Sequence, residues 1–130
     1  MRVEEVAEIL GLYRILPPPA HILLTHERIT DGGIFAGLQP KGRGDIVVLG
    51  GDASPETVIH ETLHTMGFGE ELAYPLAQLM VVKYEVVSKF PLLKQLLTRP
   101  VSYRKCDQIC KEFELAHTKY AGRVEHWVRE

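Results

Sequence analysis

The sequence of 130 residues contains only two cysteines, Cys106 and Cys110, which are too few for the disulfide frameworks that stabilise small secreted domains. The first ten residues are acidic where a signal peptide is basic, and no apolar core or cleavage site follows them. The longest apolar stretch, Leu72–Val82, is interrupted by Gln78 and is too short to span a bilayer. We therefore expect a cytoplasmic protein with no membrane segment.

A basic stripe is also lacking. Fifteen Lys and Arg residues against seventeen Asp and Glu give a net charge of −2, and no run of five like charges occurs. Proteins that bind nucleic acid usually carry such a stripe, because neutralisation of phosphates dominates their affinity. We therefore expect no nucleic-acid partner. The only feature that favours one is a set of four basic residues in the C-terminal half: Arg99, Arg104, Lys105 and Lys111.

The composition is that of a folded protein. Hydrophobic residues make up 45% and charged residues 25% of the chain, and we find no internal repeat and no low-complexity linker. A chain of this length suits one domain and leaves little room for a second. We therefore treat residues 1–130 as a single domain.

The N-terminal part predicts one helix and then strands. Apolar residues recur at helical spacing over residues 2–13, and the prolines at 17–19 end this helix. Turn-forming residues at 39–45 predict a hairpin between the two strands that flank them. Three short apolar runs, bounded by Gly, Pro and Asp, predict a small three-stranded sheet: Ile22–Thr25, Ile34–Leu38 and Ile46–Leu49.

The rest of the chain reads as helical. Ser54 and Pro55 suit the N-cap and first position of a helix over residues 55–66, which Gly67 can end. A longer, mostly buried helix is expected over residues 74–90, with a leucine-rich piece after it. Another helix is expected after Ser102, with one apolar face: Tyr103, Cys106, Cys110, Phe113, Ala116 and Tyr120. The predicted fold class is α+β with a helical C-terminal half.

One motif carries chemistry. His60-Glu61-Thr62-Leu63-His64 reads H-E-x-x-H, and residues four apart lie one above the other on a helix. Both imidazoles can therefore bind one tetrahedral zinc ion at about 2.0–2.1 Å. Zinc lowers the pKa of its bound water, and Glu61 can accept the proton as general base. The motif predicts hydrolysis of peptide bonds, and the alternative is two surface histidines on an amphipathic helix.

A catalytic zinc usually has a third protein ligand, and an acidic pair follows the motif. Gly67 and Gly69 would let the chain reverse with positive φ and bring Glu70 or Glu71 back to the metal. We expect Glu70 to be the ligand, with Glu71 as the alternative. The same acids would also favour the N-terminus of the next helix through its dipole, without any metal.

The motif and the acidic pair together resemble the zincin metallopeptidases, and more narrowly the gluzincins, whose third ligand is a glutamate on a downstream helix. The small size is similar to the minimal single-domain gluzincins, the minigluzincins. The spacing Glu70-x-x-Ala73-x-x-Leu76-Ala77-x-x-Met80 is similar to a pattern of small HExxH peptidases and favours Glu70. A metzincin-like spacing, His64-x-x-Gly67-x-x-Glu70, is the weaker alternative because no convincing Met-turn follows.

The resemblance is specific over residues 54–80. It implies a zinc cofactor, a peptide or unfolded protein as substrate, and an edge strand that aligns this substrate, either Gly33–Leu38 or Ile46–Leu49. Pro75 departs from the pattern, because it cannot donate a helical hydrogen bond. We therefore expect the next helix to begin or kink at Pro75, which would leave Glu70 on a turn.

Other candidate residues have weaker patterns. Glu85 lies 21 positions after His64, a gap that resembles larger gluzincins, and is the fallback third ligand. Cys106 and Cys110 lie four residues apart and can chelate a metal, although free cysteines on an apolar face are usually core residues. The resemblance implies a His or Tyr that stabilises the oxyanion, for which we consider three residues: His117, Tyr120 and Tyr103.

Two functional classes stay open. The intact Glu61 favours an active metallopeptidase, whereas the small size favours a silent or latent zincin scaffold that acts as a zinc-stabilised interaction module. A homo-oligomer through the C-terminal helices is also compatible with the sequence. Beyond Gly122, a last apolar strip must be buried against the protein's own core, a second subunit or the groove beside the zinc: Val124, Trp127 and Val128.

Overall fold

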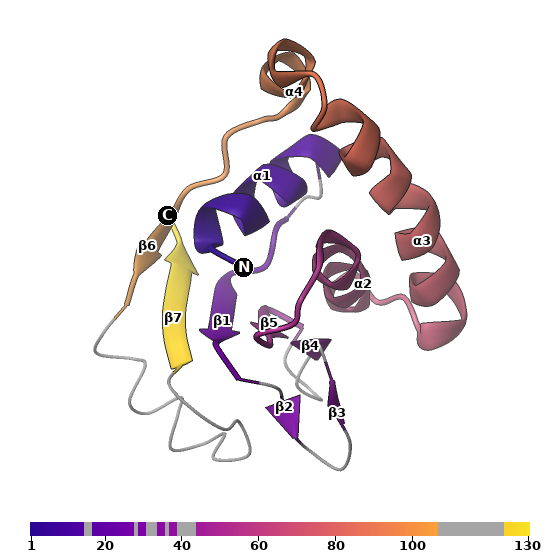
Figure 1. The fold of residues 1–130 in the computed structure, drawn as a ribbon. Coiled ribbons are helices and arrows are strands. Elements are labelled where there is room, and N and C mark those ends of the chain that lie inside the picture. Colours follow the sequence, from indigo (N-terminus) through magenta and orange to yellow (C-terminus); the bar gives the residue numbers. More distant parts are fainter. Residues whose placement is uncertain (15–16, 28, 31–33, 36, 39–43, 107–123) are drawn as a thin grey trace.

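The structure of the chain is a computed structural model that describes residues 1–14, 17–27, 29–30, 34–35, 37–38, 44–106 and 124–130. Within these ranges it has an α+β fold, in which four helices lie beside a five-stranded sheet (Figure 1). The predicted fold class is confirmed. The predicted three-stranded sheet was too small, because two strands come from the C-terminal part that we had expected to be helical.

The main sheet has the strand order β4-β5-β1-β7-β6. The central strand β1 pairs in parallel with β5 and antiparallel with β7, while β4 and β6 form the two edges (Figure 1). A separate two-stranded sheet consists of β2, Ile29–Thr30, and β3, Ile34–Phe35. The five strands of the main sheet are β1 (His21–Thr25), β4 (Gly37–Leu38), β5 (Ile46–Leu49), β6 (Tyr103–Lys105) and β7 (Val124–Arg129).

The N-terminal predictions agree well with these elements. Helix α1, Val3–Tyr13, occupies the predicted range, and β1 and β5 coincide with predicted strands to within one residue. The predicted strand over residues 34–38 is divided into β3 and β4. β4 and β5 pair antiparallel, as expected for a hairpin, although residues 39–43 of the predicted turn lie outside the described ranges.

Helix α2, Pro55–Thr65, begins and ends where local signals predict. The Ser54 hydroxyl accepts a hydrogen bond from the Thr57 N–H, and the Ser54 N–H donates to the Thr57 hydroxyl at 3.1 Å. This reciprocal cap satisfies donors that the first turn of a helix leaves unpaired. Gly67 follows the helix with φ +96°, the conformation for which a glycine was expected there.

The core lies between the helices and one face of the sheet. Leu23, Ile46 and Val48 form a smaller buried cluster on the opposite face. β1 and β5 are therefore buried on both faces, which explains their uninterrupted apolar sequences. The main cluster joins α1, β1, β5 and α2 to the third helix, and its buried members are Val3, Val6, Ile9, Leu10, Ile22, Leu24, Val47, Leu49, Val58, Ile59, Leu63, Ala73 and Ala77.

The long helix after the motif differs from its prediction. Helix α3 runs over Glu70–Val87, begins four residues earlier than expected, and contains Pro75 in its interior. It was expected to be mostly buried, but only Ala73, Ala77 and Val87 are buried along it. The side of α3 that packs on the core carries the small residues Ala73 and Ala77, while several large apolar residues of α3 are exposed. A short helix α4, Pro91–Leu97, corresponds to the leucine-rich piece.

The helices predicted for the C-terminal part were wrong where the structure describes them. Residues 103–105 form the edge strand β6, and the last apolar strip forms β7, which lies between β1 and β6. Trp127 packs on the main core, opposite Ile22 of β1, while the neighbouring His126 is fully buried. Val124 packs on the smaller cluster and Trp127 on the main one, so β7 presents side chains to both faces of the sheet, as a strand does. The strip is thus part of the protein's own sheet, and its members are partly buried there.

The helices of the described ranges include none that is both long and apolar enough to cross a membrane.

Candidate metal centre

The histidines of the motif lie together on one side of α2. Their ring centroids are 4.7 Å apart, and their Nε2 atoms approach to 3.0 Å. The opposite side of the helix is held in the core by Val58, Ile59 and Leu63, all of which are buried. Because core contacts fix how α2 is rotated, His60 and His64 are kept at the rim between α2 and α3, each only partly buried.

The chain returns to the histidines within six residues. After α2, the turn at Gly67 reverses the backbone, whereas Gly69 keeps a negative φ of −78° and caps α3. Glu70 is then the first residue of α3, and its Oε1 lies 3.1 Å from His60 Nε2 and 2.7 Å from His64 Nε2. The expectation that Pro75 would leave Glu70 outside the helix was wrong. The structure brings together the three predicted ligands, which can hold a metal ion.

A backbone carbonyl orients His64. Its Nδ1 lies 2.8 Å from the carbonyl oxygen of Phe68, which can only accept, so Nδ1 carries the proton and donates it. In the neutral ring Nε2 is then an acceptor, yet it faces the carboxylate of Glu70. Either a proton on Nε2 or a cation between these atoms resolves the contact. Without a cation, burial lowers the pKa of His64, but hydrogen bonds to Phe68 and Glu70 outweigh burial and raise it.

Glu61 has a different environment from Glu70. Only 7% of Glu61 is exposed, and its Oε1 lies 3.9 Å from His60 Nε2. Burial raises the pKa of this carboxyl group, while the nearby His60 and His64 act in the opposite direction. A carboxylate with a raised pKa beside a cluster of potential ligands is suited to accept a proton.

The edge strand β4 covers Glu61. A Cβ atom placed on Gly37 would lie 2.7 Å from Cγ2 of Thr57 and 3.1 Å from both Cγ of Glu61 and the carbonyl oxygen of Val48. Any side chain at this position would therefore collide with α2 or with β5. The glycine lets the backbone of β4 come directly against the helix that carries the motif.

The remaining predicted residues do not join the cluster. Glu71 and Glu85 are exposed on α3 and are not part of the group that can hold a metal. The Tyr103 hydroxyl donates to the carbonyl oxygen of Pro19 at 2.8 Å, so it serves the packing of β6. Cys106 follows β6, and its backbone N–H donates to the backbone carbonyl oxygen of His126. Three candidates lie outside the described residues: Cys110, His117 and Tyr120.

Sequence reasoning missed three contributors to the site. Tyr74 lies one turn after Glu70, and its ring meets that of His60 edge-on, with centroids 6.2 Å apart. The four-residue spacing from Glu70 could have indicated it. The carbonyl of Phe68 carries no side-chain signal, and the approach of Gly37 depends on how β4 packs on α2.

Two histidines without a predicted role also contact each other, His21 and His126. Nδ1 of His21 lies 2.9 Å from Nε2 of His126, and the rings stack across β1 and β7. Asp45 lies near the other side of His21, with its carboxylate 3.8 Å from Nε2. Burial and the neighbouring His21 lower the pKa of His126.

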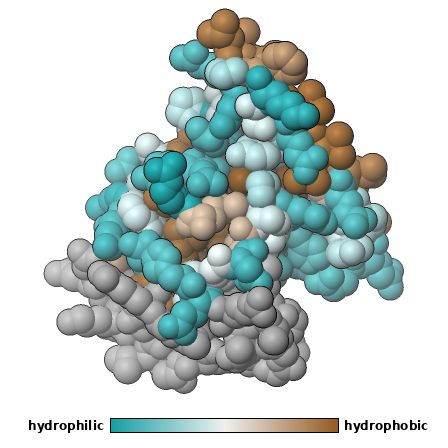
Figure 2. Space-filling view, in the orientation of Figure 1, coloured by the Kyte–Doolittle hydropathy of each residue, from teal (hydrophilic) through white to brown (hydrophobic). Residues whose placement is uncertain are grey.

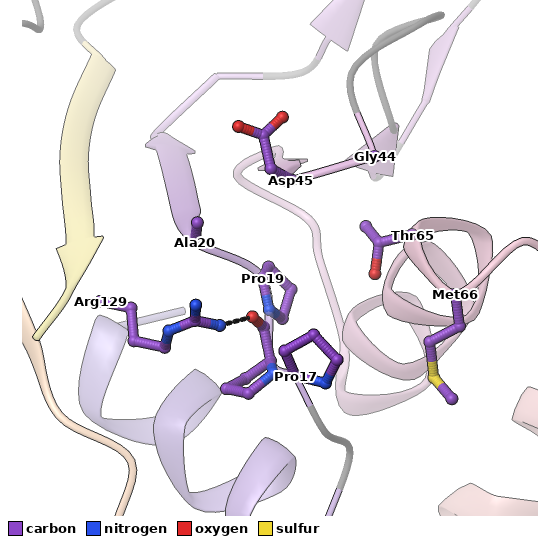
Figure 3. Close-up of a pocket in the computed structure, with 9 residues that line it drawn as sticks. Pro17, Pro19, Ala20, Gly44, Asp45, Thr65, Met66 and Arg129 are labelled. Carbon is purple, nitrogen blue, oxygen red and sulfur yellow. Dashed lines mark hydrogen bonds between the residues drawn. The ribbon is translucent and has the colours of Figure 1, made fainter.

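A hollow of about 440 Å³ lies between the proline segment and the end of α2 (Figure 3). The Arg129 guanidinium donates to the carbonyl oxygen of Pro18 on its wall, and Thr65 and Met66 line the α2 side. None of the three potential metal ligands lines this hollow. The hollow and the candidate metal centre are therefore separate sites.

Comparison with protein-family models, with curated proteins and with solved structures finds no match to this chain. A functional assignment must therefore come from the motif and the geometry around it.

Proposed function

We propose that the chain is a zinc-dependent metallopeptidase, with His60, His64 and Glu70 as ligands and Glu61 as general base. The observation that carries this proposal is the convergence of two imidazole nitrogens and a carboxylate oxygen, with His64 oriented by the Phe68 carbonyl. Metal-binding histidines commonly donate their second N–H to such a carbonyl, which directs the other nitrogen to the metal.

The donor set fits zinc in type and in spacing. Two imidazoles and one carboxylate form a common set for catalytic zinc and leave the fourth position open. Ligands at about 2.0–2.1 Å around a tetrahedral ion lie about 3.3 Å apart. The three atoms are 2.7–3.1 Å apart, so each needs to move outward by only a few tenths of an ångström to reach this spacing.

The chain's own residues supply the rest of the chemistry. Bound zinc would supply Lewis-acid activation of water and of the substrate carbonyl. Glu61 would accept the proton from the attacking water, and its buried position would keep this carboxylate from other cationic partners. Edge strand β4, whose backbone lies against α2 at Gly37, would pair with an extended peptide substrate. A cytoplasmic peptide or unfolded protein is the substrate class that we propose.

The test separates metal binding from chemistry. Glu61→Gln keeps the size and polarity of the side chain and removes the base, so zinc content should stay at the wild-type level. Hydrolysis of an unfolded protein should fall by at least the roughly 10²–10⁴-fold that general bases contribute. Glu71→Gln, an exposed neighbour of the ligand, is the matched control and should keep both properties. Equal hydrolysis by wild type and Glu61→Gln would remove the catalytic role.

A silent zinc-stabilised scaffold is the second candidate, and one observation favours it. β4 is only two residues long in the described chain, so it offers little backbone for a substrate to pair with. This candidate predicts a wild type that contains zinc, yet shows no more hydrolysis than Glu61→Gln. The latent form of this idea, with the last apolar strip covering the cleft, loses its basis because that strip is β7, inside the sheet.

A further inference from the structure

The outer side of α3 and α4 carries large apolar side chains that nothing in the described part of the chain covers. Figure 2 shows them along α4 and down the outer side of α3. Leu79 is 72% exposed and Leu96 is 80% exposed, far beyond what core residues show. We call this set the outer stripe: Leu72, Leu79, Val82, Val86, Phe90, Leu92, Leu93 and Leu96.

The spacing of the stripe along α3 is that of a helix–helix contact. Leu72, Leu79 and Val86 follow one another at seven-residue steps, and Val82 fills the intermediate position of the second step. The steps of three and four residues from Leu79 to Val82 and Val86 place these side chains on one seam, the arrangement by which a helix packs against another helix. Ala73 and Ala77 already occupy the side that packs on the core. α3 is therefore apolar on two sides, as expected for a helix with partners on both.

The size of the stripe matches a stable protein interface. From the exposed fractions of its members, the stripe presents on the order of 900 Å² of mainly apolar surface. A standard interface buries about 800 Å² on each partner, whereas the largest apolar patch of a typical monomer is about 300–600 Å².

We propose that the outer stripe is the interface of a homodimer, in which a second copy of the chain packs its own α3 and α4 on the first. A two-fold axis brings one patch against itself, so the seven-residue pattern on each α3 meets an equal pattern on its partner. Most soluble oligomers are homo-oligomers of this closed kind. The sequence suggested a homo-oligomer through the C-terminal helices, and the proposal assigns its interface to α3 and α4.

The dimer would leave the candidate metal centre open. Helical geometry places Leu72 and Tyr74 about 200° apart around α3, and Tyr74 is on the side that meets His60. The interface and the metal centre thus use different sides of one helix. The proposal therefore does not depend on zinc binding or peptidase activity.

Sedimentation velocity of the full chain, over roughly 1–100 μM, tests the proposal in the affinity range of such interfaces. The wild type should sediment as a dimer, and Leu79→Glu/Val86→Glu should raise the dimer dissociation constant at least 100-fold. Gln78→Glu, an exposed substitution on the same helix, should leave it unchanged. The single variant Leu79→Gln should weaken the dimer without adding charge, and circular dichroism should show that every variant is folded.

Two results would overturn the proposal. The first is a wild type that stays monomeric at the highest concentration. If such a monomer co-sediments with vesicles of phosphatidylcholine and phosphatidylglycerol, the outer stripe binds a membrane and not a second copy. The second is a dimer that folded Leu79→Glu/Val86→Glu does not weaken.

Discussion

Nδ1 of His64 donates to the carbonyl oxygen of Phe68 over 2.8 Å, and this contact turns the opposite ring nitrogen toward Glu70. The carbonyl belongs to the turn that ends α2 and leads into α3. One short segment thus orients a candidate ligand of α2 and positions the carboxylate of Glu70 on α3. The site consequently depends on local chain geometry, and several of its supports can be tested separately.

The identity of the third ligand is the first prediction. Glu70→Gln should weaken zinc binding by more than the roughly 10–100-fold that loss of an outer-shell partner costs. Glu71→Gln and Glu85→Gln remove exposed carboxylates of the same helix and should leave the affinity unchanged. Competition with a chromophoric chelator measures all three. A greater loss in either control than in Glu70→Gln would reassign the ligand.

The second prediction concerns the close approach of β4 to the motif helix. Gly37→Ala would place a Cβ atom 2.7 Å from Thr57 Cγ2 and 3.1 Å from the Val48 carbonyl oxygen, which cannot rotate away. Overpacking of this kind costs about 1–3 kcal/mol, which urea unfolding of the zinc-free protein measures. Hydrolysis should also fall, because the added methyl group would displace the Glu61 side chain, whose Cγ lies 3.1 Å from that Cβ position. Gly69→Ser, at an N-cap with open space around it, should change stability by less than about 0.5 kcal/mol. If Gly37→Ala were as stable as the wild type, β4 would not pack on α2 as closely as described.

The third prediction is a pH dependence from His126. Burial and His21 lower its pKa in the folded chain, so the unfolded chain binds the proton more readily. This contribution to stability is complete above the unfolded value of about 6.5 and is lost as pH falls through the folded value. Without metal, wild type should lose more stability than His126→Gln between about pH 7.5 and about pH 5.5. An equal loss in both proteins would contradict this origin.

The fourth prediction is that the C-terminal strand is structural. β7 pairs with both β1 and β6, so deletion of residues 124–130 removes the connection between them. The truncated chain should lose cooperative thermal unfolding. A folded truncation with higher peptidase activity would instead restore the idea that this segment covers the cleft.

Local signals explain which parts of the fold were predictable. The bounds of α2 follow from Ser54, Pro55 and Gly67, which act within a few residues of themselves. β6 and β7 were misread because short apolar segments fit a helix and a strand almost equally well. β7 takes its strand conformation by pairing with β1, about 100 residues earlier along the chain, and β6 pairs in turn with β7.

The same distinction holds for the candidate site. His60, His64 and Glu70 lie within eleven residues, so helix geometry and one glycine turn were enough to predict their proximity. Gly37 and Tyr74 were missed because their contacts depend on how β4 and α3 pack on α2. The exposure of α3 was missed for a related reason, since an apolar helix indicates burial but not the partner that buries it.

Zinc content tests the central claim most directly. Protein purified without added metal, measured by inductively coupled plasma mass spectrometry, should contain about one zinc per chain. His60→Ala should lose most of it, while His26→Ala, an exposed histidine outside the cluster, should retain it. A wild type without zinc that also fails to bind it on titration, or a His60→Ala variant with full occupancy, would contradict the account.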